Sequence, residues 1–208
     1  LVFHVIATLF IIYNKYHIMK NIAIFASGTG TNAENIIRYF SNSDSGRVVL
    51  VLSNRQDAAV PKRAEALNVR TVFFDRECFY GSGKILEILY RSNIDFIVLA
   101  GFLWLVTEDI LNNYPGRVIN IHPALLPLHG GKGMYGEKVH SSVIKAHEKE
   151  SGITIHYVND KYDDGDIIFQ AKCSVDPTDT PESLAVKIHA LEYKYFPLII
   201  EDLIRKLP

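Results

Sequence analysis

Short apolar runs alternate with amphipathic segments along most of the chain, beginning at Lys20. This alternation is typical of an α/β fold with a mostly parallel sheet. The apolar runs predict strands over 21–26, 47–53, 70–74, 96–100 and 118–122. Helical periodicity predicts helices over 32–40, 61–67, 84–91 and 108–113, the first with Ala33, Ile36, Ile37 and Phe40 on its apolar face and the last capped by Thr107. We therefore expect a Rossmann-like, mostly parallel sheet flanked by helices.

The pattern changes after residue 122. Residues 123–137 contain four glycines and two prolines, which predicts an irregular loop before a helix over 138–148. Residues 153–158 alternate like an antiparallel or edge strand, and residues 167–174 are expected to pair with them around a turn at 163–165. A closing helix is expected to begin at Thr180-Pro181-Glu182 and to run to about Lys206. The sheet is thus expected to end in an antiparallel C-terminal strand addition.

The first 18 residues precede the first methionine, Met19, and differ in character from the rest. Their apolar stretch, Val5 to Tyr13, is shorter than the about 20 residues that cross a bilayer. They also lack the basic region and small-residue cleavage site of a signal peptide. We interpret residues 1–18 as a spurious upstream extension of a single domain over 19–208, with a membrane-associating leader as the alternative.

Composition narrows the class of protein. The 208 residues carry 22 Lys and Arg against 23 Asp and Glu, a net charge of −1, whereas nucleic-acid binders usually have a basic excess. A hydrophobic content of 48% is enough to build a core and excludes a disordered chain. The two cysteines, Cys78 and Cys173, form no C-x-x-C pair, which excludes a disulfide scaffold or zinc ribbon and fits a reducing cytoplasm.

A glycine loop, Ser27 to Asn32, connects the first predicted strand to the first predicted helix. Free backbone N–H groups at a helix N-terminus suit a phosphate. Gly28, Gly30 and Ala33 also match the dinucleotide pattern G-x-G-x-x-G/A, but the second strand ends in Ser53-Asn54-Arg55 without the acid that NAD binding requires. We favour a monophosphate site. Arg55 keeps an NADP-binding reductase as one alternative, and a tight turn that binds no ligand is the other.

Asn120 and His122 end the fifth predicted strand, just before Pro123. Strand alternation places both side chains on one face, at the carboxyl edge where open α/β sheets bind ligands. An amide that donates to a developing oxyanion, beside an imidazole that moves protons, suits acyl chemistry. A buried, hydrogen-bonded pair without catalytic function is the alternative.

A carboxylate partner for His122 is available on the turn Asp163-Asp164-Gly165. A negative charge nearby would raise the histidine pKa, although such a turn is equally ordinary as a hydrated loop. The other histidines give weaker signals. His140 and His147 are seven residues apart, ~10 Å along a helix, too far to share a metal. His129 and His156 are interpreted as surface or strand residues, and no metal site is expected.

Five segments in this order resemble the phosphoribosylglycinamide formyltransferases, folate-dependent enzymes of purine synthesis. They are Ser27-Gly28-Thr29-Gly30-Thr31-Asn32, Leu99-Ala100-Gly101-Phe102-Leu103, Asn120-Ile121-His122-Pro123-Ala124-Leu125-Leu126-Pro127, Thr154-Ile155-His156 and Asp163-Asp164-Gly165-Asp166-Ile167-Ile168. The resemblance covers the chain from Met19 to its end. It implies a formyltransferase fold, with 10-formyltetrahydrofolate as co-substrate and no metal.

The resemblance also implies roles for individual residues. Asn120 would polarise the formyl oxygen and stabilise the tetrahedral intermediate, while His122 manages the proton. Asp163 would keep His122 partly protonated and order a water, and Thr154 would support that region. The substrate phosphate would lie on Gly30, Thr31 and Asn32, the glycinamide and ribose end on His189 and Glu192, and the folate on Arg76, Leu103, Trp104, Leu105, Val106 and Asn120.

Three departures from the family pattern limit this transfer of roles. Trp104 stands where many relatives carry a basic residue, so only backbone contacts are expected there. The loop from Gly130 to Gly136 differs from the commoner form, and Asp164 replaces a frequent glycine.

Related activities stay open as alternatives to the transferase. A formyltetrahydrofolate hydrolase or a methionyl-tRNA formyltransferase-like core would share the same site. An NADP-binding reductase or nucleotide-binding module would explain the glycine loop alone. The partners expected are small molecules, without nucleic acid or membrane, for a monomer or homodimer.

Overall fold

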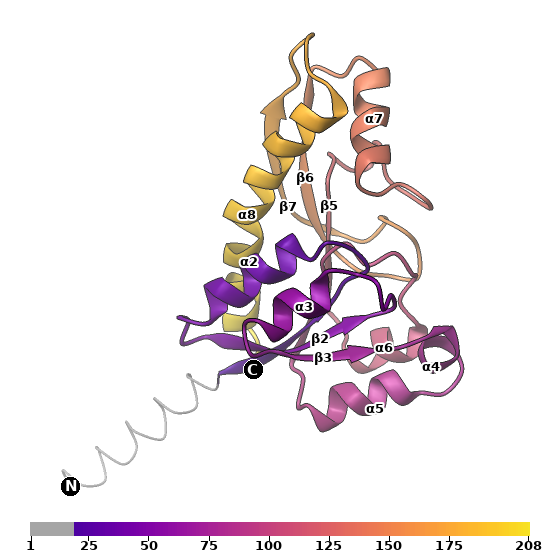
Figure 1. The fold of residues 1–208 in the computed structure, drawn as a ribbon, viewed down its shortest axis with the longest axis vertical. Helices are drawn as coiled ribbons and strands as arrows, with labels where there is room; N and C mark the ends of the chain where they lie inside the picture. The colour runs from indigo at the N-terminus through magenta and orange to yellow at the C-terminus, as the bar shows by residue number, and fades with distance from the viewer. Residues whose placement is uncertain (1–18) are drawn as a thin grey trace, which may run out of the picture.

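The computed structural model describes residues 19–208, which form a seven-stranded sheet in the order β3-β2-β1-β4-β5-β6-β7 (Figure 1). The strands are β1 (Lys20–Phe25), β2 (Gly46–Ser53), β3 (Arg70–Phe73), β4 (Phe96–Leu99), β5 (Val118–His122), β6 (Glu150–Tyr157) and β7 (Ile167–Ser174). The first five pair in parallel, whereas β6 is antiparallel to both β5 and β7. The expected parallel sheet with an antiparallel C-terminal addition is confirmed.

The helices follow the predicted order with one addition. They are α2 (Thr31–Phe40), α3 (Val60–Glu65), α4 (Arg76–Tyr80), α5 (Lys84–Arg91), α6 (Glu108–Asn113), α7 (Glu137–Lys145) and α8 (Pro181–Arg205). The additional helix, α4, has only five residues, too few to show a helical period. The side chain of Asp75 caps it by accepting a hydrogen bond from the backbone N–H of Cys78.

Two apolar cores cover the two faces of the sheet because successive strand residues point to opposite sides. In β1, Ile22 and Ile24 join the core beneath α2, α3 and α8, whereas Ala23 and Phe25 join the core beneath α4, α5 and α6. The predicted apolar face of α2, residues 33, 36, 37 and 40, is buried. Because helices cover both faces of the sheet, the ends of the strands are where polar groups can contact a ligand.

Some predicted boundaries differ from the structure. Strand β6 begins at Glu150, three residues before the predicted start, and α7 ends at Lys145 rather than 148. Thr107 occupies the N-cap of α6 as expected, but its side chain makes no capping hydrogen bond. The closing helix α8 does begin with a capping box, in which Thr180 and Ser183 each accept from the other's backbone N–H.

The strand order reverses between β1 and β4, because the chain proceeds from β1 to β3 on one side and then from β4 to β7 on the other. Ligands bind at this switch point in open α/β sheets, outside the carboxyl ends of the strands. Residues 1–18, interpreted above as an extension, lie outside the described residues. Within residues 19–208, no helix combines the length and the apolar character that crossing a bilayer requires.

Candidate active site

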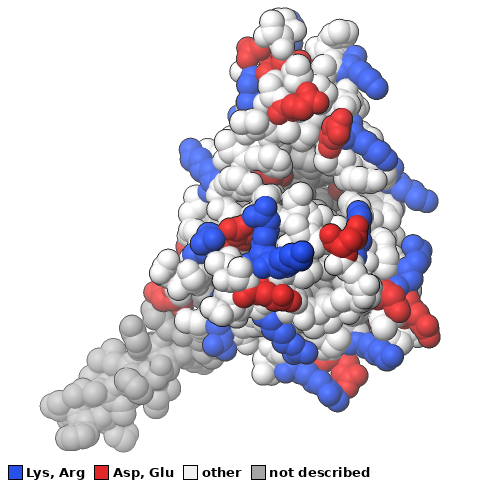
Figure 2. Space-filling view, in the orientation of Figure 1, with Lys and Arg blue, Asp and Glu red and all other residues white. Residues whose placement is uncertain are grey.

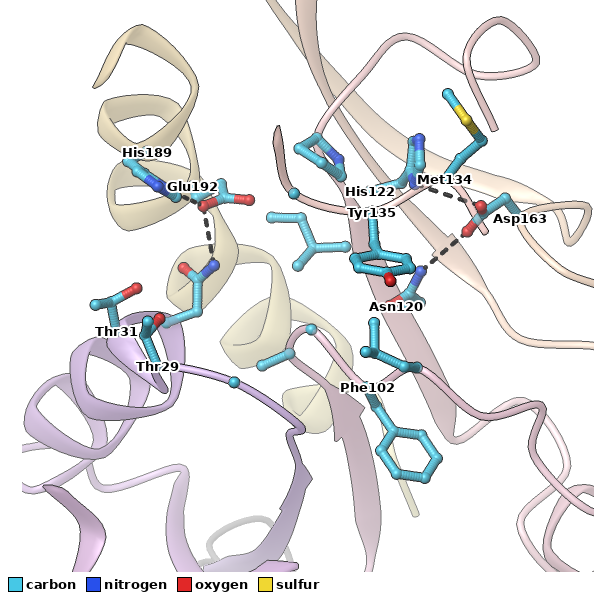
Figure 3. A pocket seen from close by; sticks show the side chains of 18 of the residues that line it. Thr29, Thr31, Phe102, Asn120, His122, Met134, Tyr135, Asp163, His189 and Glu192 are labelled. Carbon is cyan, nitrogen blue, oxygen red and sulfur yellow. Dashed lines mark hydrogen bonds and ion pairs between the residues drawn. The ribbon is translucent and has the colours of Figure 1, made fainter. Parts of the chain in front are cut away.

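A cavity opens at the switch point, beside the carboxyl ends of β1, β4 and β5 (Figure 3). Its walls consist of residues 28–32, 100–103, 120–123, 131, 133–136, 140, 162, 163, 189 and 192. His189 and Glu192 project from α8 on one side of the cavity, and Asn120, His122 and Asp163 lie on the other. The cavity therefore joins the glycine loop to the strand end that the sequence singles out.

The glycine loop forms the part of the cavity wall next to the start of α2. Gly30 is the N-cap of α2 with a φ of 76°, and a Cβ there would lie 2.5 Å from the Cβ of Val60. Only glycine fits this conformation without displacing Val60. No side chain caps α2, so the backbone N–H groups of its first turn are available to an anion.

Asn32, His189 and Glu192 form a polar cluster next to the glycine loop. Nδ2 of Asn32 donates to Oε2 of Glu192 at 2.9 Å, and Nδ1 of His189 lies 2.8 Å from the same oxygen. This hydrogen bond to Glu192 raises the pKa of His189. Glu192 is only 4% exposed, and a carboxylate in this position accepts hydrogen bonds from hydroxyl groups. The cluster thus suits the hydroxyl groups of a sugar whose phosphate or other anionic group binds at the start of α2.

His122 lies between two acceptors. Its Nε2 is 2.9 Å from the carbonyl oxygen of His129, and its Nδ1 is 3.4 Å from Oδ2 of Asp163. Because a carbonyl oxygen only accepts, Nε2 carries the proton in the neutral ring, and Nδ1 faces Asp163 unprotonated. Proton uptake at Nδ1 therefore creates an imidazolium directly beside a carboxylate.

The pKa of His122 corrects one expectation. Burial lowers this pKa below its ordinary 6.5, although the carboxylate of Asp163 and the carbonyl of His129 act in the opposite direction. The expected rise caused by Asp163 is present, but desolvation outweighs it because His122 is only 3% exposed. Burial also raises the pKa of Asp163, but hydrogen bonds and the neighbouring histidines bring it below 3.8 overall. The pair is thus poised as a neutral base beside an ionised carboxylate.

Asn120 and His156 form a contact that the sequence interpretation missed. Nδ2 of Asn120 lies 3.1 Å from Nε2 of His156 and donates to Oδ1 of Asp163 at 3.4 Å. Nδ1 of His156 lies 2.7 Å from the carbonyl oxygen of Tyr157. His156 is a strand residue as expected, but it is 2% exposed and belongs to the cluster. The signal that could have identified it is its register, because it pairs directly with Asn120.

Thr154 supports the loop that leaves β5. Its hydroxyl donates to the carbonyl oxygen of Ala124 at 2.7 Å and accepts from the N–H of Leu126 at 3.0 Å. Nε2 of Gln170 donates to the same hydroxyl at 2.9 Å, a contact absent from the sequence interpretation. Thr154 is fully buried and pairs with His122 across β5 and β6. It therefore holds the loop that carries the carbonyl of His129.

Only some of the residues expected to bind folate line the cavity. Leu103 lines the cavity, and its N–H donates to Oγ of Ser27 at 3.1 Å. Val106 is buried in the apolar core, and Trp104 and Leu105 lie outside the cavity wall. The guanidinium of Arg76 lies 5.5 Å from the ring centre of Trp104, also away from the wall. Of the expected folate residues, Leu103 and Asn120 are thus the ones that line the cavity.

Comparison with known proteins gives the family. A family model described as formyl transferase matches residues 20–200, and the chain belongs to this family. The phosphoribosylglycinamide formyltransferase of Bacillus subtilis is 36% identical over 192 residues, which cover 89% of this chain and 95% of that protein. The chloroplastic phosphoribosylglycinamide formyltransferase of Arabidopsis thaliana is 37% identical over 187 residues, or 87% of this chain, which spans 64% of that protein's length.

Solved structures agree with this family. The crystal structure of phosphoribosylglycinamide formyltransferase from Bacillus halodurans matches with a TM-score of 0.81 at 36% identity, covering 90% of this chain and 96% of that one. The protein of the same name from Anaplasma phagocytophilum matches with a TM-score of 0.83 at 30% identity, covering 91% and 88%. The formyltransferase fold expected from the sequence is confirmed.

Within residues 19–208, no group of three or more His, Cys, Asp or Glu side chains is arranged to hold a metal ion. Cys78 and Cys173 are both free thiols.

Proposed function

We propose that residues 19–208 form one domain that transfers the formyl group of 10-formyltetrahydrofolate to the amine of phosphoribosylglycinamide, a step of purine biosynthesis. The observation that carries the proposal is the arrangement of one cavity. The uncapped N–H groups at the start of α2 and the buried carboxylate of Glu192 line one side, and the Asn120–His122–Asp163 cluster lines the other. A phosphorylated sugar with an amine at its far end matches this order of groups.

The substrate would bind through two kinds of contact. Gly30, Thr31 and Asn32 would hold the phosphate on the free N–H groups at the start of α2. Glu192, oriented by His189, would accept hydrogen bonds from the ribose hydroxyls. These contacts would hold the amine beside Asn120 and His122, so that attack becomes intramolecular in effect.

The reaction needs an oxyanion donor and a base. As the amine nitrogen attacks the formyl carbon, an N–H of Asn120 would donate to the oxygen that gains negative charge. Nδ1 of His122 would accept the proton lost by the amine, and Asp163 would stabilise the resulting imidazolium. His122 would then return this proton to the folate nitrogen as the carbon–nitrogen bond to the folate breaks.

The folate would approach from the side of Leu103, which lines the cavity after β4. Backbone groups of Leu103, Trp104, Leu105 and Val106 are proposed to contact its pterin. Arg76, exposed over the rings of Tyr80 and Trp104, is proposed to bind the acidic tail of the folate. The resemblance of the chain to the formyl transferase family supports these folate contacts.

We propose that the partners are small molecules, without nucleic acid or membrane. Figure 2 shows acidic and basic side chains interspersed over the visible face, without the single-sign surface that a phosphate backbone requires. The proposed enzyme is a monomer or homodimer that uses no metal, and its two free thiols suit the cytoplasm.

The test is an absorbance assay of 10-formyltetrahydrofolate consumption, with and without phosphoribosylglycinamide. The proposal predicts consumption that depends on the amine. Consumption at the same rate without the amine would identify a hydrolase, and no consumption with either would reject formyl transfer. Titration with NADPH tests the reductase alternative, which tight binding would favour.

A further inference from the structure

His140 is a buried histidine that the reaction described above does not use. It lies in the first turns of α7 and lines the same cavity as His122 and Glu192. It is 3% exposed, and its Nδ1 has no hydrogen-bond partner among residues 19–208. A buried polar atom without a partner is uncommon in folded proteins and requires a physical explanation.

His140 shares the cavity with His189 and Glu192 and with the proposed catalytic base, His122. Burial has the largest effect on the pKa of His140 and lowers it. The charges of His189 and His122 also lower this pKa, whereas the carboxylate of Glu192 raises it. The ring of His140 is neutral, so one nitrogen can donate a hydrogen bond and the other can accept one.

A second atom in the same cavity also lacks a partner. Asn32 donates through Nδ2 to Glu192, but its Oδ1 is buried without a partner among the described residues. Both residues line the cavity, so a ligand that fills it lies beside both side chains. The ligand group they need combines a hydrogen-bond donor for Asn32 with a polar atom for a neutral imidazole.

We propose that His140 is a substrate-binding residue that contacts the carboxamide of phosphoribosylglycinamide, with Oδ1 of Asn32 accepting the amide N–H. The inference rests on the proposed function. In this substrate the carboxamide lies between the ribose and the reacting amine, and His140 lines the same cavity as Glu192 and His122. The contact fixes the direction of the chain beyond the sugar and thereby aims the amine at the formyl carbon.

The test measures binding of two ligands by calorimetry. Phosphoribosylglycinamide has the carboxamide, whereas ribose 5-phosphate has the phosphate and the hydroxyls without it. His140→Leu is expected to weaken binding of phosphoribosylglycinamide roughly tenfold, since it removes a buried hydrogen bond and leaves the amide unpaired. Binding of ribose 5-phosphate is expected to stay within about twofold of the wild type. At least one of His140→Asn and His140→Gln, which keep a polar group at the Nδ1 or Nε2 position, is expected to restore most of the loss.

Val143→Ala is the matched control, because Val143 is buried one turn further along α7 and does not line the cavity. It is expected to leave both affinities unchanged. Equal weakening of both ligands by His140→Leu, or failure of both polar variants to recover binding, overturns the inference. If His140→Leu still transfers the formyl group to the amine and binds phosphoribosylglycinamide as tightly as the wild type, the inference fails while the proposed function stands. A wild type that does not bind phosphoribosylglycinamide overturns the proposed function together with it.

Discussion

His156 lies directly opposite Asn120 in the antiparallel pair β5–β6, and its Nε2 is 3.1 Å from Nδ2 of Asn120. Because the carbonyl oxygen of Tyr157 can only accept, Nδ1 of His156 donates to it, which leaves Nε2 to accept. It therefore takes one N–H of the Asn120 amide and fixes which way that amide faces. The second N–H, held only loosely by Asp163 at 3.4 Å, is left for a substrate oxygen.

The first prediction follows from this contact. His156→Leu is expected to lower kcat roughly 10- to 100-fold, less than the 10²- to 10³-fold typical of removing an oxyanion donor outright, because Asn120 stays but loses its orientation. KM is expected to change little, since the contact acts in the transition state. His156→Gln can both donate to Tyr157 and accept from Asn120, so it is expected to recover part of the rate.

Thermal unfolding of the same variants provides the control. A role limited to packing would lower kcat and stability together in both variants, with no advantage for His156→Gln. Such a result would show that His156 does not orient the amide of Asn120.

The second prediction concerns pH. The carboxylate of Asp163 raises the pKa of His122 against the larger effect of burial. Replacing it in Asp163→Asn is expected to lower that pKa further, so the acidic limb of the kcat/KM profile moves to lower pH. The plateau is expected to fall roughly 10²-fold because the imidazolium loses its stabilising charge. The substrate amine titrates equally in both enzymes, so comparing their profiles isolates His122. A limb that moves to higher pH would contradict the assignment of His122 as the base.

The third prediction concerns the hydroxyl of Thr154. Thr154→Val leaves the carbonyl of Ala124, the N–H of Leu126 and the amide of Gln170 without their shared partner. We expect a loss of about 1–3 kcal/mol in the free energy of unfolding and a lower kcat, because the loop carries the carbonyl bound to His122. Thr154→Ser keeps the hydroxyl and is expected to preserve most of both. Denaturant unfolding and kinetics measure the two effects, and a stable, fully active Thr154→Val would show that the loop needs no such support.

The fourth prediction compares two glycines of one loop. Gly30→Ala is expected to destabilise the fold by about 1–3 kcal/mol, because a side chain there meets Val60 in a left-handed conformation. Gly28→Ala is the matched control, because a Cβ at Gly28 has no other atom within 4 Å. Denaturant unfolding of both variants tests the difference. Equal stability of the two would mean that the N-cap of α2 tolerates a side chain.

The sequence predicts the fold well because its apolar runs and the hydrophobic periods of its helices are clear. The five parallel strands and the pairing of β6 with β7 follow from apolar runs and turn residues, and the observed boundaries lie within three residues of those predicted. Helix α4 could not be predicted from periodicity because five residues complete little more than one turn. Strand alternation also places Asn120 and His122 on one face, as the structure shows.

The rest of the site depends on contacts between distant segments. His156 reaches Asn120 only through the register of β5 and β6, and Gln170 reaches Thr154 through that of β6 and β7. His140 lines the cavity because α7 packs beside α8, which no local pattern encodes. The lowered pKa of His122 likewise depends on burial, a property of the packed structure that a nearby carboxylate in the sequence does not reveal.

The most direct test of the account follows the formyl carbon itself. 10-Formyltetrahydrofolate labelled with ¹³C in the formyl group is incubated with phosphoribosylglycinamide, and the products are separated and analysed by mass spectrometry. The label is expected on the amine of phosphoribosylglycinamide with the wild type and not with His122→Ala, which is expected to retain folate binding. Label released as formate, or equal transfer by His122→Ala, would contradict this expectation.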